Sequence, residues 1–144
     1  MAGPHEDYQR ALIDDLRAHE GTVSDGPLKG RTMMLLTTKG ARSGQERRVV
    51  VTFSRDGDRY VIAASKGGAP TNPSWYYNLV ANPVVTVEAG GAVFQARATE
   101  MHGDERNRLW KLHADRWPEF QAYPTKTDRV IPMFTVEAVP TAAS

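Results

Sequence analysis

Residues 49–65 read VVVTFSRDGDRYVIAAS, and this stretch decides the fold of the chain. β-Branched and aromatic side chains dominate the segments 49–55 and 59–65, as they do in strands. Between the two segments stands Asp56-Gly57-Asp58, and an Asp-Gly pair accepts the positive φ that a tight turn requires. The stretch therefore predicts two antiparallel strands joined as a hairpin.

Four further segments have the length and composition of strands: 32–38, 84–89, 92–100 and 130–138. Gly90-Gly91 separates two of these segments and predicts a second hairpin. Pro132 lacks a backbone donor, so it indicates an edge or bulge position for the last strand. Six short, mostly antiparallel strands cannot bury both faces as an open sheet. A small barrel with helices at its ends is the expected solution.

Three segments predict helices. Residues 5–20 carry apolar side chains at helical spacing and charges on the other face, so they predict an amphipathic helix. A second helix follows Asn72 and Pro73, which suit an N-cap and a first helical position. The third predicted helix covers 103–117. The fold class is therefore mainly β with flanking helices.

Composition bounds the number of domains and the class of partner. A chain of 144 residues that is 40% hydrophobic can bury one core, so we expect a single domain over 1–144 with a loose tail at 140–144. Eighteen Lys and Arg stand against 17 Asp and Glu, and the net charge is +1. Nucleic-acid-binding proteins usually carry a larger basic excess, so no nucleic-acid partner is expected.

Several other classes of site are disfavoured. Without cysteine there are no disulfides and no thiolate nucleophile, and the four histidines stand too far apart to suggest a metal site. No apolar run approaches the roughly 20 residues that span a bilayer, and the first residues lack a signal-peptide core. The expected location is cytoplasmic, and peripheral membrane contact through the helix 5–20 remains open.

Positive charge is concentrated in two glycine-containing loops. The first, KGARSGQERR at 39–48, holds Lys39, Arg42, Arg47 and Arg48, and the second, ASKGGAP at 64–70, holds Lys66. Arginine forks match phosphate oxygens, and glycines let backbone N–H groups approach an anion. On a nearly neutral chain this pattern favours a small anionic ligand. A solvated loop is the alternative interpretation.

The segments LLTTKGARSGQERR (35–48), DGDRYVIAASKGGAPTNPSWYYNLVANP (56–83) and TDRVIP (127–132) resemble the deazaflavin-dependent nitroreductase family. The resemblance spans about 28–139, with the motifs in the same order. It implies a split β-barrel of the FMN-binding type, with about six strands, and an oxidoreductase that uses coenzyme F420. Such proteins are typical of actinobacteria. An FMN-binding split barrel is the alternative that keeps this fold.

The resemblance also implies which residues hold the cofactor. The first loop and the following strand would bind the phosphate, the acidic tail and one side of the ring, and the second loop and the helix after it would complete the pocket. The implied contacts are Lys39, Arg42, Ser43, Arg47, Val49, Val50, Ser65, Lys66, Gly67, Gly68, Ala69, Trp75 and Tyr76. Arg48 occupies a more variable position and is interpreted as solvated. Core packing is an equal alternative for Trp75 and Tyr76.

The stretch RWPEFQAYPTKTDR (116–129) corresponds to a substrate-proximal segment that carries several tyrosines in nitro-reducing members. Here the implied substrate residues are Trp117, Phe120 and Tyr123, and only the last keeps a phenol. A proton would come from Tyr123, Ser65 or solvent. The alternative for these aromatic residues is that they close the barrel end.

The expected function is hydride transfer from reduced coenzyme F420 to an electron-poor small molecule, namely a quinone, an activated alkene or a nitro compound. A deazaflavin delivers a hydride, so the protein needs to bind and orient, and no nucleophile is required. A non-enzymatic cofactor carrier is a further alternative. Monomer and homodimer both remain open.

Overall fold

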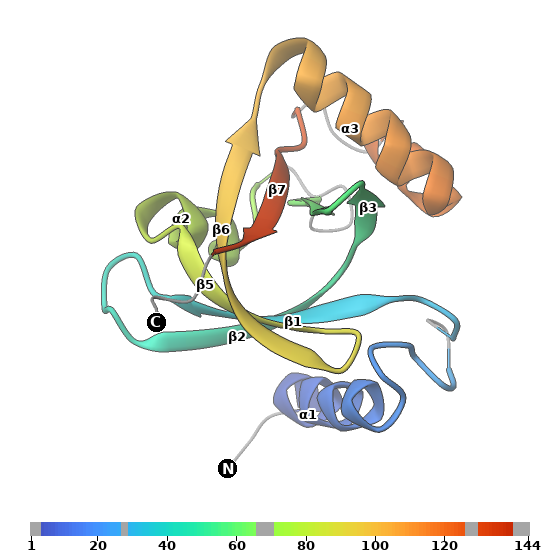
Figure 1. Cartoon of the computed structure of the whole chain (residues 1–144), viewed down its shortest axis with the longest axis vertical. Coiled ribbons are helices and arrows are strands. Elements are labelled where there is room, and N and C mark those ends of the chain that lie inside the picture. The colour runs from blue at the N-terminus through green and yellow to red at the C-terminus, as the bar shows by residue number, and fades with distance from the viewer. Residues whose placement is uncertain (1–3, 27–28, 66–70, 126–129, 140–144) are drawn as a thin grey trace.

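The structure is a computed structural model that describes residues 4–26, 29–65, 71–125 and 130–139. It consists of a curled β-sheet with helices packed around it (Figure 1). In chain order the elements are α1 (Pro4–Ala18), β1 (Met33–Lys39), β2 (Glu46–Thr52), β3 (Ser54–Asp56), β4 (Arg59–Ala63), α2 (Ser74–Ala81), β5 (Val84–Ala89), β6 (Ala92–Met101), α3 (Gly103–Arg116), a 3₁₀-helix (Pro118–Thr125) and β7 (Met133–Ala138).

The sheet closes on itself at Phe53. Its strand order is β2-β1-β5-β6-β7-β4-β3, and every pairing is antiparallel. The two edge strands, β2 and β3, are consecutive in the chain and are separated by Phe53 alone. The sheet must therefore curl until its edges meet, which produces the split barrel seen in Figure 1.

The expected split barrel with flanking helices is confirmed, and the expected strand count of about six becomes seven among the described residues. The difference lies at Phe53, where the predicted strand 49–55 bends and changes its pairing partner. Residues before the bend pair with β1, and residues after it pair with β4.

Both predicted hairpins are present. Gly57 in the β3–β4 turn has φ 60°, and Gly90 and Gly91 in the β5–β6 turn have φ 58° and 84°. These are left-handed values that favour glycine.

Two local expectations were wrong. Pro132 precedes β7, and β7 is a central strand that pairs with both β6 and β4, so the proline displaces no ladder bond. The cap residue of α2 is Pro73 rather than Asn72, and a proline side chain donates and accepts no capping hydrogen bond.

The barrel interior holds the larger apolar cluster. One face of each long strand contributes to it, and α2 inserts Trp75 and Leu79 against Phe134 and the surrounding side chains. The buried members of this cluster are Met34, Leu36, Val51, Phe53, Ile62, Ala64, Trp75, Leu79, Val85, Val87, Ala89, Ala96, Ala98, Phe134 and Val136. Because α2 packs into this cluster, the barrel core positions α2 relative to the strands.

A second apolar cluster lies under α3 and the 3₁₀-helix, on the outer face of β4 and β7. Its buried members are Val61, Ala63, Leu109, Ala114, Trp117, Phe120, Ile131 and Met133. This cluster packs α3 against the opposite side of the sheet from the barrel interior, since neighbouring residues of β4 alternate between the two clusters.

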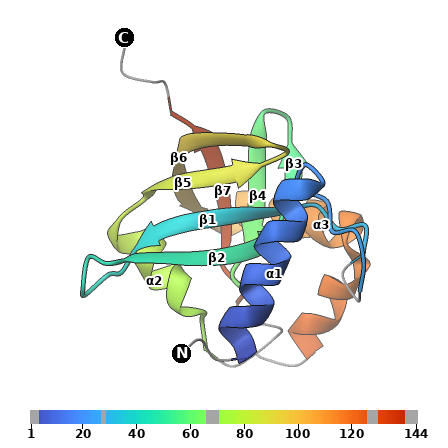
Figure 2. The same ribbon diagram turned by 90° about the horizontal axis from the view of Figure 1, so that it is seen from below.

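The amphipathic helix predicted over 5–20 is present as α1 and lies across the outside of the sheet (Figure 2). Leu16 packs with Val23 and Met33, and the Arg17 guanidinium binds both carboxylate oxygens of Glu88 at 3.0 and 2.9 Å. Ile13 and Leu16 face the protein, so these side chains do not support membrane contact. Within the described residues no helix is long and apolar enough to span a bilayer. The predicted tail 140–144 lies outside the described residues, and the single domain over 1–144 stays a prediction.

His113 is a buried titratable group between α3 and β3. Its side chain is fully buried, its Nδ1 lies 2.8 Å from Ser54 Oγ, and its ring meets Phe120 edge-on at 4.5 Å. Burial, with a smaller contribution from the nearby Arg31 cation, lowers the pKa of His113 from 6.5 to about 4. The folded protein therefore holds this imidazole neutral.

We expect His113 to make the free energy of unfolding depend on pH, at pH values above those at which ordinary carboxylates titrate. The unfolded chain binds a proton near pH 6.5 and the folded chain only near pH 4, so stability is lost as pH falls through this interval. The free energy of unfolding should drop by about 2 kcal/mol between about pH 7.5 and about pH 5.

Chemical denaturation of the wild type and His113→Gln at both pH values measures this loss. His113→Gln should lack the drop, whereas the exposed His102→Gln should retain it. An equal drop in both variants would place the titrating group elsewhere.

Candidate active site

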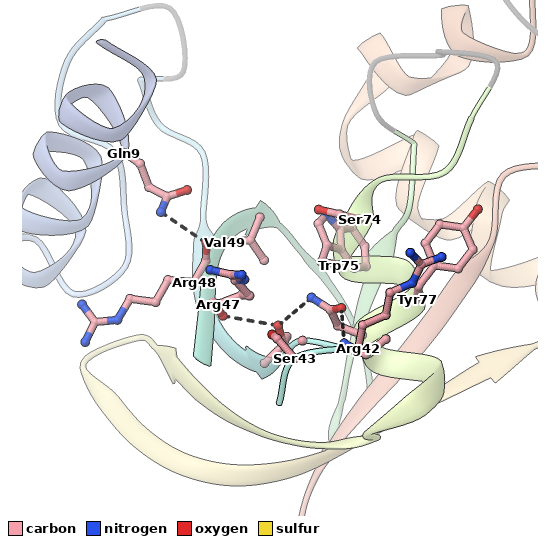
Figure 3. Close-up of a pocket in the computed structure, with 13 residues that line it drawn as sticks. Gln9, Arg42, Ser43, Arg47, Arg48, Val49, Ser74, Trp75 and Tyr77 are labelled. Atoms are coloured by element: carbon pink, nitrogen blue, oxygen red, sulfur yellow. Dashed lines mark hydrogen bonds between the residues drawn. The ribbon is translucent and has the colours of Figure 1, made fainter. Parts of the chain in front are cut away.

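A cleft of about 750 Å³ opens between the β1–β2 loop, β2, α2 and the first turns of α1 (Figure 3). Its volume is in the range of small-molecule and cofactor sites. The described residues that line it are Gln9, Thr38, Gly40, Ala41, Arg42, Ser43, Arg47, Arg48, Val49, Ser74, Trp75, Tyr77 and Asn78.

The β1–β2 loop has a compact, glycine-dependent backbone. Gly40 N donates to Gln45 O at 2.7 Å, and Gly44 N donates to Gly40 O at 3.0 Å. A Cβ on Gly40 would lie 2.7 Å from Ser43 Oγ, and Gly44 has φ 71°. The left-handed φ of Gly44 favours glycine there, whereas a side chain at Gly40 would displace the Ser43 hydroxyl. The loop places the side chains of Arg42 and Ser43 at one rim of the cleft.

Arg42 and Arg47 place two cations at the cleft. Both side chains are exposed, and within the described residues neither forms an ion pair with a carboxylate. In Figure 3 the Arg47 guanidinium lies in the cleft below Val49, and that of Arg42 lies beside Tyr77. Arg48 also lines the cleft, but its side chain extends outward, away from the other two. This rim of the cleft suits an anion.

α2 forms the opposite, mainly aromatic wall. Trp75 is buried with 9% of its surface exposed, whereas Tyr77 is 52% exposed. Ser74, the first residue of α2, also lines the cleft, so the positive end of the helix lies at this wall. The cleft thus combines aromatic surface on one side with positive charge on the other.

Five of the predicted cofactor residues meet in this cleft: Arg42, Ser43, Arg47, Val49 and Trp75. Four others are described but do not line it: Lys39, Val50, Ser65 and Tyr76. Lys66, Gly67, Gly68 and Ala69 lie outside the described residues.

Three of the four predicted residues that do not line the cleft have clear environments in the structure. Val50 packs against the α1 cluster, and Ser65 follows β4 in a half-buried position. Tyr76 points to the other side of α2, where its hydroxyl donates to Glu100 Oε1 at 2.9 Å. There it lines a separate cavity of about 480 Å³. Their assigned cofactor contacts stay predictions.

Sequence reasoning missed part of the lining: Gln9, Thr38, Gly40, Ala41, Ser74, Tyr77 and Asn78, together with Arg48, which it interpreted as solvated. Gln9 comes from α1 and donates to Arg48 O at 3.2 Å. Asn78 belongs to α2, and its Oδ1 accepts from Ala41 N at 2.9 Å. Both contacts join segments that are distant in sequence, so no local pattern signalled them.

The structure does not bring the predicted substrate residues to this cleft. Trp117 and Phe120 are 7% and 5% exposed in the second apolar cluster, and Trp117 Nε1 donates to Phe53 O at 2.9 Å. Tyr123 is half-buried, with its ring 5.0 Å from that of Phe120. All three side chains thus pack in or against the apolar cluster on the outer face of β4 and β7. A substrate role for the three stays a prediction, as does proton donation by Tyr123 or Ser65.

A protein-family model described as F420H(2)-dependent quinone reductase matches residues 8–138, nearly the whole chain. The chain belongs to the F420H(2)-dependent quinone reductase family. An F420H(2)-dependent quinone reductase of Mycobacterium tuberculosis is 41% identical over 106 residues, which are 69% of each chain.

Solved structures agree with this family membership. The structure of an F420-H2-dependent reductase, FDR-A, shares 45% identity at a TM-score of 0.67 and covers 73% of this chain and 93% of its own. A structure described as a domain-swapped dimer shares 41% identity at a TM-score of 0.69, covering 94% and 100% of the two chains.

Membership of the quinone reductase family confirms the expected enzyme class and cofactor, coenzyme F420 rather than FMN. The resemblance to deazaflavin-dependent reductases is likewise confirmed. The residues present fit this cofactor, because unpaired arginines suit its phosphodiester and acidic tail and an aromatic wall suits its flat ring.

Proposed function

We propose that this protein transfers a hydride from reduced coenzyme F420, held in the cleft, to a quinone. The supporting observation is that Arg42 and Arg47, which form no ion pair among the described residues, share a cleft with the wall formed by Trp75 and Tyr77, in a chain of this family. A quinone is flat, apolar and electron-poor, so it suits stacking against a ring held by such a wall.

The protein's contribution is binding, orientation and exclusion of water. Arg42, Arg47 and the donors of the β1–β2 loop would hold the phosphate and tail, and Val49 and Trp75 would contact the ring. The predicted contacts of Lys66 and its glycine loop belong to the same proposal. When bound, the reduced cofactor supplies the hydride. No nucleophilic side chain is required.

The proposed proton donors for the acceptor do not line the cleft. Tyr123 carries the phenol of its segment and is half-buried, so it is the proposed proton donor, with Ser65 and solvent as the other sources. A homodimer is also proposed, since one similar structure is described as a domain-swapped dimer. Membrane contact through α1 would require its apolar face to leave the sheet.

Cofactor choice and turnover test this function directly. Fluorescence titration should show coenzyme F420 binding with a dissociation constant on the order of micromolar or tighter, and FMN binding much more weakly. Reduced cofactor should then be oxidised by quinones in a panel that also contains enones and nitroaromatics.

Three results would contradict the proposal. FMN binding of comparable strength would contradict the choice of cofactor. Binding without oxidation by any acceptor would indicate a cofactor carrier. Preference for a nitroaromatic or an enone over every quinone would contradict the acceptor class.

A further inference from the structure

Asn78 belongs to α2, but its side chain is bonded to the opposite rim of the cleft. Its Oδ1 accepts a hydrogen bond from Ala41 N at 2.9 Å, and its Nδ2 donates to Thr38 Oγ1 at 3.4 Å. The residue is 9% exposed. Both polar atoms of the amide are thus engaged, so a residue that can both accept and donate is needed at this position.

Thr38 extends this connection to β2. Its hydroxyl donates to Arg47 O at 3.3 Å, and the β1–β2 register places Thr38 opposite Arg47. Through Ala41 and Thr38, α2 therefore reaches the backbone on both sides of the loop 40–45. One of these two attachment points is the backbone of Arg47, whose guanidinium lies inside the cleft (Figure 3).

The loop has little other support. Residues 41–48 are all exposed, and none of them belongs to an apolar cluster. Its ends are held by the paired strand residues Lys39 and Glu46, and its own bonds, such as Gly40 N to Gln45 O, close the turn. Exposed backbone bonds with few apolar contacts define a segment of low local stability. A site that must order on binding loses affinity to that ordering.

We propose that Asn78 is the positioning residue of the anion site. It holds the loop 40–45 and the Arg47 backbone in a binding-ready arrangement, and it keeps them in register with the aromatic wall on α2. The identity of the anion rests on the proposed function, namely the phosphate-bearing cofactor. The positioning itself is a property of the free protein.

A comparison of two ligands tests whether Asn78 positions the anion site or contacts the deazaflavin ring directly. One is coenzyme F420, and the other is a deazaflavin with the ribityl chain but no phosphate. Asn78→Ala should weaken F420 binding by about tenfold, since it removes the two hydrogen bonds, to Ala41 N and Thr38 Oγ1, that tether the loop to α2. Binding of the phosphate-free deazaflavin should stay within about twofold of the wild type.

Two variants calibrate the effect. Thr38→Val keeps the shape of the side chain but removes the hydroxyl, so it breaks the contacts to Arg47 O and Asn78 Nδ2. It leaves the bond between Ala41 N and Asn78 Oδ1 in place, so it should cause a smaller loss of F420 affinity. Asn82→Ala is the matched control, because Asn82 is the C-cap residue of the same helix and contributes its backbone N–H to that helix. It should bind both ligands like the wild type.

A second readout needs no ligand. Amide hydrogen exchange over 40–45 in the free protein should be faster in Asn78→Ala than in the wild type and Asn82→Ala. Three results for Asn78→Ala overturn the proposal: an unchanged exchange rate over 40–45, an unchanged affinity for F420, or an equal loss of affinity for both ligands. If the wild type binds neither ligand, the proposed function fails, while the exchange measurement still decides the role of Asn78.

Discussion

Arg47→Ala is expected to weaken binding of coenzyme F420 by about ten- to a hundredfold, because a charge-assisted contact to phosphate contributes about 1.5–3 kcal/mol. Arg47 lies within the cleft and has no carboxylate partner among the described residues, so no internal ion pair competes for its guanidinium. Fluorescence titration of the purified variant measures the change. Its thermal unfolding should match that of the wild type, since the side chain is exposed.

Arg48→Ala is the matched control, one residue along the same strand. Its side chain also borders the cleft but extends away from it, so its loss of affinity should be several-fold smaller. Wild-type affinity should fall as salt is added, because the arginines are exposed to solvent. If neither Arg47→Ala nor Arg48→Ala changed the affinity for F420, the result would contradict an anion site on β2.

Phe120→Ala is expected to lower the free energy of unfolding by about 3–5 kcal/mol, as large-to-small changes of buried aromatic residues do. The ring contacts His113, Trp110 and Tyr123 edge-on, with centroids 4.5, 6.5 and 5.0 Å away. Denaturant unfolding measures the loss. Because this cluster lies outside the cleft, the folded fraction should bind coenzyme F420 with nearly wild-type affinity.

A milder substitution of Phe120 tests whether this residue contacts the electron acceptor. Phe120→Leu keeps much of the apolar volume and should cost less stability, so the folded variant can be assayed against the acceptor panel. An unchanged acceptor profile would show that Phe120 serves the core alone. A changed profile with unaltered F420 affinity would show that acceptors reach this cluster. Loss of F420 affinity in the folded variant would contradict the separation of cluster and cleft.

Local chemistry predicted most of the elements. The Asp56-Gly57-Asp58 turn, the Gly90-Gly91 turn and the spacing in α1 are properties of neighbouring residues, and each was read correctly. The cation-rich loop was equally legible, because charge and glycine content are visible without the fold. Motif order then indicated the family before any tertiary contact was known.

The expectations that failed depended on pairing rather than on local preference. Pro132 indicated an edge or bulge position, but the proline stands just before β7, and β7 pairs with β6 and β4. The strand predicted over 49–55 is divided at Phe53, because its two halves meet different partners across the barrel.

The sequence by itself determined the hairpins, the amphipathic helix and the cations of the β1–β2 loop, since these follow from residue type and short-range spacing. Its resemblance to a known family indicated the split barrel and the cofactor. Only the tertiary structure decided which residues share the cleft. Asn78 meets Ala41 across 37 positions, and Trp117 meets Phe53 across 64. Such contacts arise when the two sheet edges join at Phe53 and α2 packs into the core. Their geometry is set by closure of the whole sheet rather than by the residues next to them.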